Sequence, residues 1–261
     1  MKPLLMVLLI AISPVVAYAG TFSDDFNDGI LDGWEPRLFI PGGPRPGARI
    51  PVKIQNGYVV MDAREKPNDN LILPGFKLVF LKLRAGNARN WNAYTFTCRV
   101  RIAEVWEEPP AAFGHAAFGI TVREGRGRFN VVAYQTMLID PLDQEGQVFT
   151  YPPDVKPVGG KPVGGVTIHR GNFKVPIKLK RWYPIKIVAN AGNFSFYFNN
   201  KLLIEYEDKT AVPGTVSFRT DFGMVAHIDD VVITGPKVPD LANSVTPKGH
   251  LTTLWGEIKT D

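Results

Sequence analysis

The chain has 261 residues, of which 45% are hydrophobic, and its 30 Lys and Arg against 25 Asp and Glu give a formal net charge of +5. That hydrophobic fraction is normal for a globular core and excludes a disordered chain. The charge excess is too small to indicate a nucleic-acid-binding protein, so we expect no nucleic-acid partner.

Residues 1–19 have the three-part pattern of a cleavable secretory signal. Lys2 supplies a positive start, residues 4–16 are mostly apolar, and small residues precede Gly20 at the cleavage position. The apolar run is shorter than the roughly 20 residues of a membrane span, although an uncleaved anchor is the alternative. We therefore expect a secreted or periplasmic protein with no membrane span after cleavage.

Alternating hydrophobicity predicts strands along most of the remaining chain. Such runs occur at residues 58–61, 76–83, 94–102, 116–122, 129–137, 183–188, 194–198, 202–206, 214–219 and 226–233. Gly or Pro clusters bound most of them, and no segment keeps a helical period. About 11 to 13 short strands predict one all-β sandwich or barrel, which we place at residues 20–235. Asn199 and Asn200 predict a hairpin turn, because Asn tolerates positive φ.

Three segments interrupt this pattern. Residues 41–51 are rich in Pro and Gly, and residues 140–165 are strand-poor and contain Lys-Pro-Val-Gly-Gly twice in tandem. Loops of that length inside a compact domain are usually functional or mobile. Residues 236–261 look like a linker followed by an apolar tail.

The single cysteine, Cys98, lies in an alternating run and leaves the exported chain without an internal disulfide. The fold must then be stabilised by its core. Because unpaired Cys is among the most buried residue types, we expect Cys98 to be a buried hydrophobe rather than a nucleophile.

Short motifs across residues 21–235 resemble the concanavalin A-like jelly rolls of secreted bacterial proteins. They are the opening segments 22–29 and 31–34, the run 56–60, and the closing segments 182–187, 194–205, 214–218 and 228–231. The resemblance implies an all-β, two-sheet antiparallel jelly-roll sandwich. This group includes laminin G-like modules, carbohydrate-binding modules and 3-keto-disaccharide hydrolases, so the fold alone does not determine the function.

Acidic residues give little support to glycoside hydrolysis. Residues 132–140 loosely resemble the hydrolase strand that ends in an acidic residue, but the Glu-x-Asp-x-x-Glu strand of the related β-glucanases is absent. A retaining glycosidase needs two carboxyl groups about 5–5.5 Å apart. No pair with that pattern lies on an apolar-flanked strand, so the sequence leans away from an enzyme.

Oxygen-bearing side chains near both ends of the predicted sandwich indicate a metal site. Asp25 and Asn27 open the domain, and Asp230 lies on its last strand. The resemblance implies that these strands are neighbours, which would gather the hard oxygen ligands that Ca²⁺ prefers. We expect a structural calcium ion; the alternative is a turn whose side chains bond local backbone N–H groups.

Aromatic and polar side chains on or near the central strands indicate a glycan site. Sugar rings pack their C–H faces on aromatic rings, while a few placed polar groups bind the hydroxyls. The candidates are Trp91, Trp106, Arg123, Tyr134, Gln135, Asp140 and Trp182. The alternative is that most of the aromatic residues belong to the core.

Two further patterns have both a functional and a structural interpretation. His227 and Asp229 share a strand face and could form an acid–base pair, although a lone strand histidine near a carboxylate is more often structural. The basic residues within 169–186 could attract an anionic polysaccharide, or they could be solvated strand faces.

Together these patterns predict a secreted, monomeric carbohydrate-binding sandwich whose partner is a polysaccharide or oligosaccharide. The alternatives are a glycoside hydrolase of the 3-keto-disaccharide type and a structural envelope protein that mediates protein contacts. An open face lined by aromatic residues would favour binding. Two carboxylates converging in a pocket, Asp140 among them, would favour hydrolysis.

Overall fold

A computed structural model describes residues 19–39, 49–64, 78–84, 87–106, 116–126, 132–153, 168–221 and 223–243. The predicted signal segment before residue 19, the duplicated Lys-Pro-Val-Gly-Gly sequence and the apolar tail lie outside these residues. Within them, no helix is long and apolar enough to cross a membrane.

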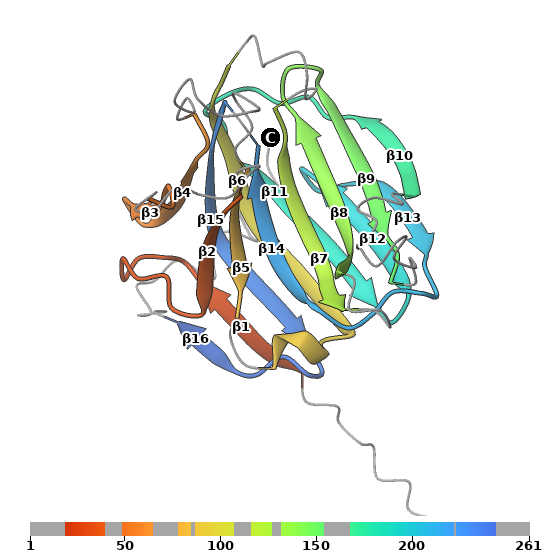
Figure 1. Ribbon diagram of the computed structural model, residues 1–261. Helices are drawn as coiled ribbons and strands as arrows, with labels where there is room; N and C mark the ends of the chain where they lie inside the picture. The colour runs from red at the N-terminus through yellow and green to blue at the C-terminus, as the bar shows by residue number, and fades with distance from the viewer. Residues whose placement is uncertain are drawn as a thin grey trace, which may run out of the picture.

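The strands form two sheets that pack face to face as a sandwich (Figure 1). The nine-stranded sheet has the order β13 (Lys201–Glu207), β12 (Asn193–Phe198), β11 (Tyr183–Asn190), β6 (Ala93–Val105), β15 (Met224–Gly235), β1 (Gly20–Asp24) and β16 (Leu241–Asn243), with β4 (Tyr58–Asp62) paired to β15 and β3 (Val52–Gln55) paired to β4. All these pairs are antiparallel except β1 with β16.

The seven-stranded sheet is entirely antiparallel. Its order is β10 (Ile168–Lys174), β9 (Glu145–Tyr151), β8 (Val132–Asp140), β7 (Phe118–Arg126), β14 (Thr215–Thr220), β5 (Leu78–Leu83) and β2 (Trp34–Phe39). The 3₁₀ turn η1 (Ala88–Asn90) precedes β6. The chain passes repeatedly from one sheet to the other, and the predicted jelly-roll sandwich is confirmed.

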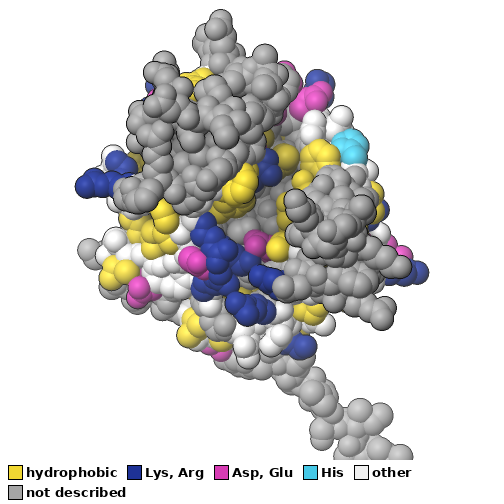
Figure 2. Space-filling view, viewed as in Figure 1, with side chains coloured by type: hydrophobic (Ala, Val, Ile, Leu, Met, Phe, Trp, Pro, Cys, Tyr) yellow, Lys and Arg dark blue, Asp and Glu magenta, His cyan; other side chains and the backbone are white. Residues whose placement is uncertain are grey.

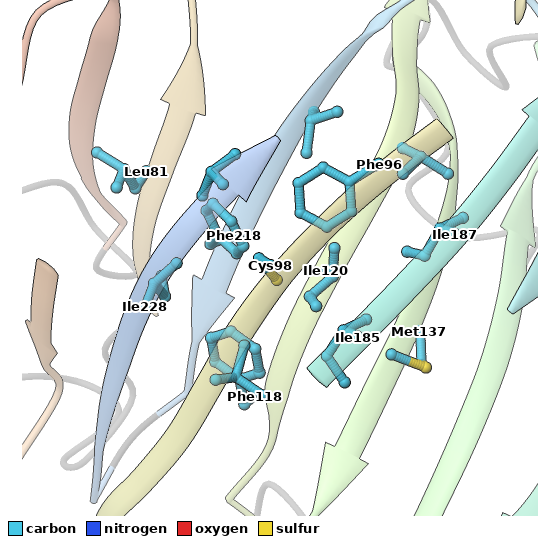
Figure 3. Packing of buried hydrophobic residues seen from close by; sticks show 14 of the residues in the cluster. Leu81, Phe96, Cys98, Phe118, Ile120, Met137, Ile185, Ile187, Phe218 and Ile228 are labelled. Carbon is cyan, nitrogen blue, oxygen red and sulfur yellow. The ribbon is translucent and has the colours of Figure 1, made fainter. Parts of the chain in front are cut away.

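The core lies between the sheets, on the inward face of each alternating strand. Phe96 and Cys98 of β6 meet Phe118 and Ile120 of β7 and Phe218 of β14 (Figure 3). Full burial of one such large side chain stabilises the fold by about 1.5–3 kcal/mol. Cys98 is buried as predicted, and burial raises the pKa of its thiol.

The turn between β12 and β13 is the predicted hairpin, with Asn199 at φ 48° and Asn200 at φ 62°. Two expectations were wrong. Residues 140–165 are not strand-poor throughout, because β9 lies among them. The sheet also continues past residue 235, where β16 pairs with β1.

Candidate functional site

The outer face of the seven-stranded sheet carries charged and polar side chains in rows that cross all seven strands. In register, one row is Glu35, Lys82, Ser217, Thr121, Thr136, Phe149 and His169, and the next is Arg37, Phe80, Arg219, Gly119, Leu138, Gln147 and Asn172. The charged members stand mainly on β2, β5 and β14. This face therefore has a charged half and a more neutral half.

A β-bulge in β7 changes which side chains reach this face. Strict alternation from Thr121 would place Arg123 on the outer face, but the register shifts between Val122 and Gly125, and Arg123 has φ 56°. Bulges of this kind re-aim side chains near functional sites. Arg123 consequently turns inward, and the following residue, Glu124, turns outward.

The Arg123 guanidinium is fixed inside the sandwich by backbone carbonyls. Its Nε donates to the carbonyl of Val212 at 2.6 Å, and its terminal nitrogens donate to the carbonyls of Asn92 at 2.5 Å and Ala211 at 3.1 Å. Its backbone N–H donates to the Tyr94 hydroxyl at 2.8 Å. Arg123 is thus a buried structural residue, and its predicted ligand-binding role does not fit this position.

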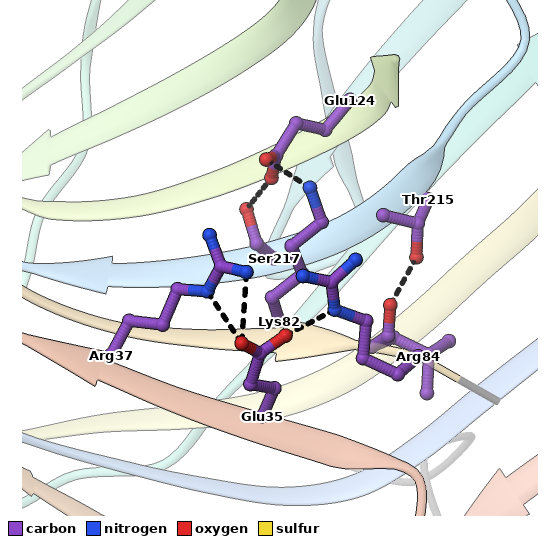
Figure 4. Close-up of polar contacts among 8 residues, drawn as sticks. Glu35, Arg37, Lys82, Arg84, Glu124, Thr215 and Ser217 are labelled. Atoms are coloured by element: carbon purple, nitrogen blue, oxygen red, sulfur yellow. Dashed lines mark hydrogen bonds and ion pairs between the residues drawn. The ribbon is translucent and has the colours of Figure 1, made fainter. Parts of the chain in front are cut away.

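Glu124 stands on the outer face and is bound on both oxygens. Lys82 forms an ion pair with Oε1, and Ser217 Oγ donates to Oε2 at 2.6 Å (Figure 4). The Lys82 and Glu124 side chains are only 16% and 17% exposed. A charge pair this sheltered is screened less by solvent than a surface pair.

Glu35 joins two arginines beside this pair. Its Oε1 accepts from Arg37 Nε at 2.9 Å, and its Oε2 accepts from Arg84 Nε (Figure 4). The hydrogen bond from Arg84, followed by that from Arg37, holds the pKa of Glu35 below its usual value. Glu35 therefore stays ionised near neutral pH and holds both guanidinium groups.

A pocket of about 320 Å³ opens between these groups. Its lining residues are Arg37, Leu38, Phe39, Phe80, Lys82, Glu124 and Ser217. The Phe39 side chain is 50% exposed. Figure 2 shows Lys and Arg side chains gathered near the middle of this face with hydrophobic side chains next to them. The pocket thus combines aromatic walls with two cationic groups, one carboxylate and one hydroxyl.

The neighbouring half of the face holds a stacked tyrosine pair. Tyr134 and Tyr151 lie on paired strands with ring centroids 4.2 Å apart, and burial raises the pKa of Tyr134. Arg219 donates to both oxygens of Asp221, each at 2.5 Å. Of the predicted ligand residues, Tyr134 has its side chain on this outer face, near the start of β8.

The other predicted ligand residues are dispersed. Trp91 is fully buried, and Trp106 is half-buried with its backbone N–H bonded to the carbonyl of Gly223. Asp140 accepts from the backbone N–H groups of Leu142 and Asp143 in the turn after β8.

Gln135 lies inside the sandwich instead of on the outer face. Its Nε2 donates to Asp208 at 2.8 Å, and its Oε1 accepts from the hydroxyls of Thr150 and Tyr206. Each polar end is therefore satisfied within the protein, as buried amides require.

Trp182 lies on the outer face of the opposite, nine-stranded sheet. The Arg101 guanidinium lies 4.6 Å from the Trp182 ring and 5.0 Å from the Tyr58 ring. His227 stacks on Tyr58 at 4.7 Å and accepts from Arg101 Nε at 3.0 Å, and burial together with Arg101 lowers the pKa of His227 to about 4. Asp229 instead accepts from a terminal nitrogen of Arg99 at 2.7 Å, so among the described contacts His227 and Asp229 do not form the suggested acid–base pair.

The predicted metal ligands are engaged in other contacts. β1 and β15 are neighbours as expected, but Asp25 accepts from the backbone N–H of Asn27 at 3.1 Å and Asp230 is ion-paired with Arg99 at 2.6 Å. Across the described ranges, no group of three or more His, Cys, Asp or Glu side chains is placed to hold a metal. The turn alternative describes the Asp25 geometry, and calcium stays a prediction.

Comparison with known proteins identifies the class of fold. No protein-family model matches the chain, and no curated protein sequence matches it. Among solved structures, the laminarinase from Rhodothermus marinus is 11% identical with a TM-score of 0.58, over 82% of this chain and 95% of that one. The β-glucanase of Bacillus licheniformis is 12% identical with a TM-score of 0.54, over 82% and 97%.

A carbohydrate-binding module, CBM66 from Bacillus subtilis, is 14% identical with a TM-score of 0.50, over 76% of this chain and 93% of the module. At these identities the likeness shows the fold alone. The chain has a concanavalin A-like jelly-roll fold, similar in architecture to glucanases and to a carbohydrate-binding module.

Proposed function

We propose that this protein binds carbohydrate in the pocket between β2, β5, β14 and β7. The observation that carries the proposal is the pocket itself, in which Phe39 and Phe80 supply apolar walls and Arg37, Lys82 and Ser217 supply polar groups. Glycan sites combine such walls with a few placed polar groups. Similarity of fold to carbohydrate-active and carbohydrate-binding proteins supports the same proposal.

The carboxylates of the face favour binding over hydrolysis. A glycosidase needs a general acid with a raised pKa next to a second carboxylate. Glu35 and Glu124 are held by cations, and Asp140 caps a turn away from the pocket lining. Burial raises the pKa of Asp221, but that group is buried and bonded to Arg219 through both oxygens.

Export and calcium are separate parts of the proposal. The signal pattern of residues 1–19 supports a mature chain that starts at Gly20, and the intact mass of the exported protein tests this directly. A structural calcium ion at Asp25, Asn27 and Asp230 would raise the melting temperature. An unchanged melting temperature in EDTA would contradict it.

Binding to a glycan array tests the main proposal, with Phe39→Ala as the site variant. Because Phe39 is half exposed, its truncation should leave the fold intact while removing one wall of the pocket. Leu202→Ala is the matched control, since Leu202 is 45% exposed on β13 of the other sheet. We expect about a tenfold loss of affinity for Phe39→Ala and none for the control. Failure of the wild type to bind any glycan, or equal binding by both variants, would contradict the proposal.

A further inference from the structure

The pocket carries an excess of positive charge and of hydrogen-bond donors. Among the described residues, Arg37, Lys82 and Glu124 line the pocket, and Arg84 and Glu35 lie beside it, so three cations stand against two carboxylates. We infer that the glycan bound here is acidic, with carboxylate or sulfate groups on its rings. This inference rests on the proposed function and specifies its ligand class.

The carboxylates beside the pocket already bind cations or a hydroxyl of the protein. Glu35 Oε1 accepts from Arg37 and Oε2 from Arg84, while Glu124 Oε1 accepts from Lys82 and Oε2 from Ser217. Each of the four carboxylate oxygens therefore has a partner before any ligand enters. Each oxygen can accept one more hydrogen bond, but the neighbouring cations already offset its charge. The cations instead favour a ligand that brings negative charge, because charge-assisted hydrogen bonds are the stronger ones.

The hydrogen-bond donors of these cations, in contrast, outnumber their acceptors among the residues that the structure describes. A guanidinium has five N–H donors and an ammonium has three. In the contacts of the structure, Arg84 donates to Glu35 through Nε, and Lys82 donates once to Glu124. The Arg37 side chain is 51% exposed and binds Glu35 through Nε and one terminal nitrogen, and its second terminal nitrogen has no acceptor among the described residues. A ligand that brings negatively charged oxygens meets this surplus.

The three cations are held at fixed positions around the pocket. Glu35 lies directly across from Lys82 in the β2–β5 register and holds one arginine on each of its oxygens. Figure 4 shows the two guanidinium groups on either side of the Glu35 carboxylate, with Lys82 next to them. Groups fixed before binding lose little conformational entropy when the ligand arrives. Arg219, which lies further along the face, is neutralised by Asp221 and adds no free charge.

Matched glycan pairs test the inference by isothermal titration calorimetry on the full-length chain. Polygalacturonate is compared with its methyl ester, which has the same rings without the charge, and a sulfated galactan with its desulfated form. A neutral β-glucan completes the set. We expect the charged member of at least one pair to bind about tenfold tighter or more, since charge-assisted hydrogen bonds are the stronger ones. That advantage should shrink between about 20 mM and 500 mM salt.

Single-residue variants test whether the preference for acidic glycans arises in this pocket. Arg37→Ala and Arg84→Ala should each reduce affinity for the acidic glycan about tenfold, while Lys186→Ala, which removes the same charge from an exposed position on β11, should not. Arg37→Lys keeps the charge but loses the planar guanidinium. If a carboxylate is recognised, its affinity for the acidic glycan should lie between those of Arg37→Ala and the wild type. If a variant folds poorly, the salt dependence of wild-type affinity for the acidic glycan still tests the inference.

The outcomes separate the two proposals. Equal affinity for charged and neutral glycans would overturn the inference and leave carbohydrate binding intact. Binding of no glycan at all would overturn both. If Lys186→Ala weakened the preference for acidic glycans as much as Arg37→Ala does, the glycan would be attracted by the net charge of the chain. That result would overturn the assignment of the preference to this pocket. Preference for the sulfated or for the carboxylated member identifies which anion the pocket accepts.

Discussion

Arg123 and Glu124 are consecutive residues of β7, and a bulge exchanges the faces that regular alternation would give them. Arg123 reaches three backbone carbonyls inside the sandwich, while Glu124 reaches Lys82 and Ser217 outside. One local change in backbone conformation thus places Arg123 where it binds buried carbonyls and places the Glu124 carboxylate in the proposed site.

The effects of removing Glu124 and of removing Lys82 on the free energy of unfolding should not be additive. Glu124→Gln leaves a sheltered ammonium without its counter-charge, and we expect a loss of about 1–3 kcal/mol in the free energy of unfolding. Replacing both residues, as in Glu124→Gln with Lys82→Met, should cost less than the two single changes together. Urea denaturation of all four proteins gives the coupling energy, and strict additivity would show that the pair contributes nothing.

Removal of Arg123 should affect stability but not recognition. Arg123→Ala leaves buried carbonyls without donors, so we expect a loss of about 2–4 kcal/mol in the free energy of unfolding. The dissociation constant for a bound glycan, measured well below the melting temperature, should stay within about twofold of the wild-type value. A large loss of affinity with unchanged stability would show that Arg123 contacts the ligand.

Asp24 should make stability depend on pH. It accepts from the backbone N–H of Phe26 and from Trp34 Nε1, each at 2.9 Å, and so joins β1 to β2 of the opposite sheet. Burial, the largest cause, raises the pKa of Asp24 to about 7. Because the folded state then binds the proton more tightly than the unfolded state, this group's stabilising contribution is present below about pH 4 and is lost as pH rises to about 7.

Asp24→Asn removes that titration. The difference in unfolding free energy between wild type and variant should therefore change in favour of the wild type as pH falls from about 7 to about 4, by up to about 1.4 kcal/mol per pH unit. Chemical denaturation at four or five pH values measures it. A difference that is flat over this range, or that changes in the opposite direction, would show that Asp24 is ionised in the folded state throughout.

The sequence was most informative where inward-facing residues are large. Residues 183–188 and 194–198 alternate strongly, and β11 and β12 lie there as predicted. β9 was missed because its buried positions are Gly146, Val148 and Thr150, which give a weak hydrophobic alternation. β10 was missed because it is an edge strand whose residues are largely exposed or half-buried.

The site was less predictable, because residue type does not reveal which face a side chain occupies. Trp91 and Gln135 are as suitable for a glycan as for a core, and only the fold shows that both are buried. The bulge at Arg123 leaves no clear mark in the sequence. Charges at alternate positions, Glu35 with Arg37 and Lys82 with Arg84, did mark one polar strand face, and this pattern was the available indication of the pocket.

The most direct test is to map, by NMR, which backbone amides change chemical shift when an acidic oligosaccharide is titrated into the isotope-labelled protein. The account predicts saturable shifts on β2, β5 and β14, centred on Arg37, Lys82 and Ser217, with no change around Tyr58 and Trp182 on the opposite sheet. Shifts confined to the Tyr58 and Trp182 face, or none at saturating ligand, would contradict it.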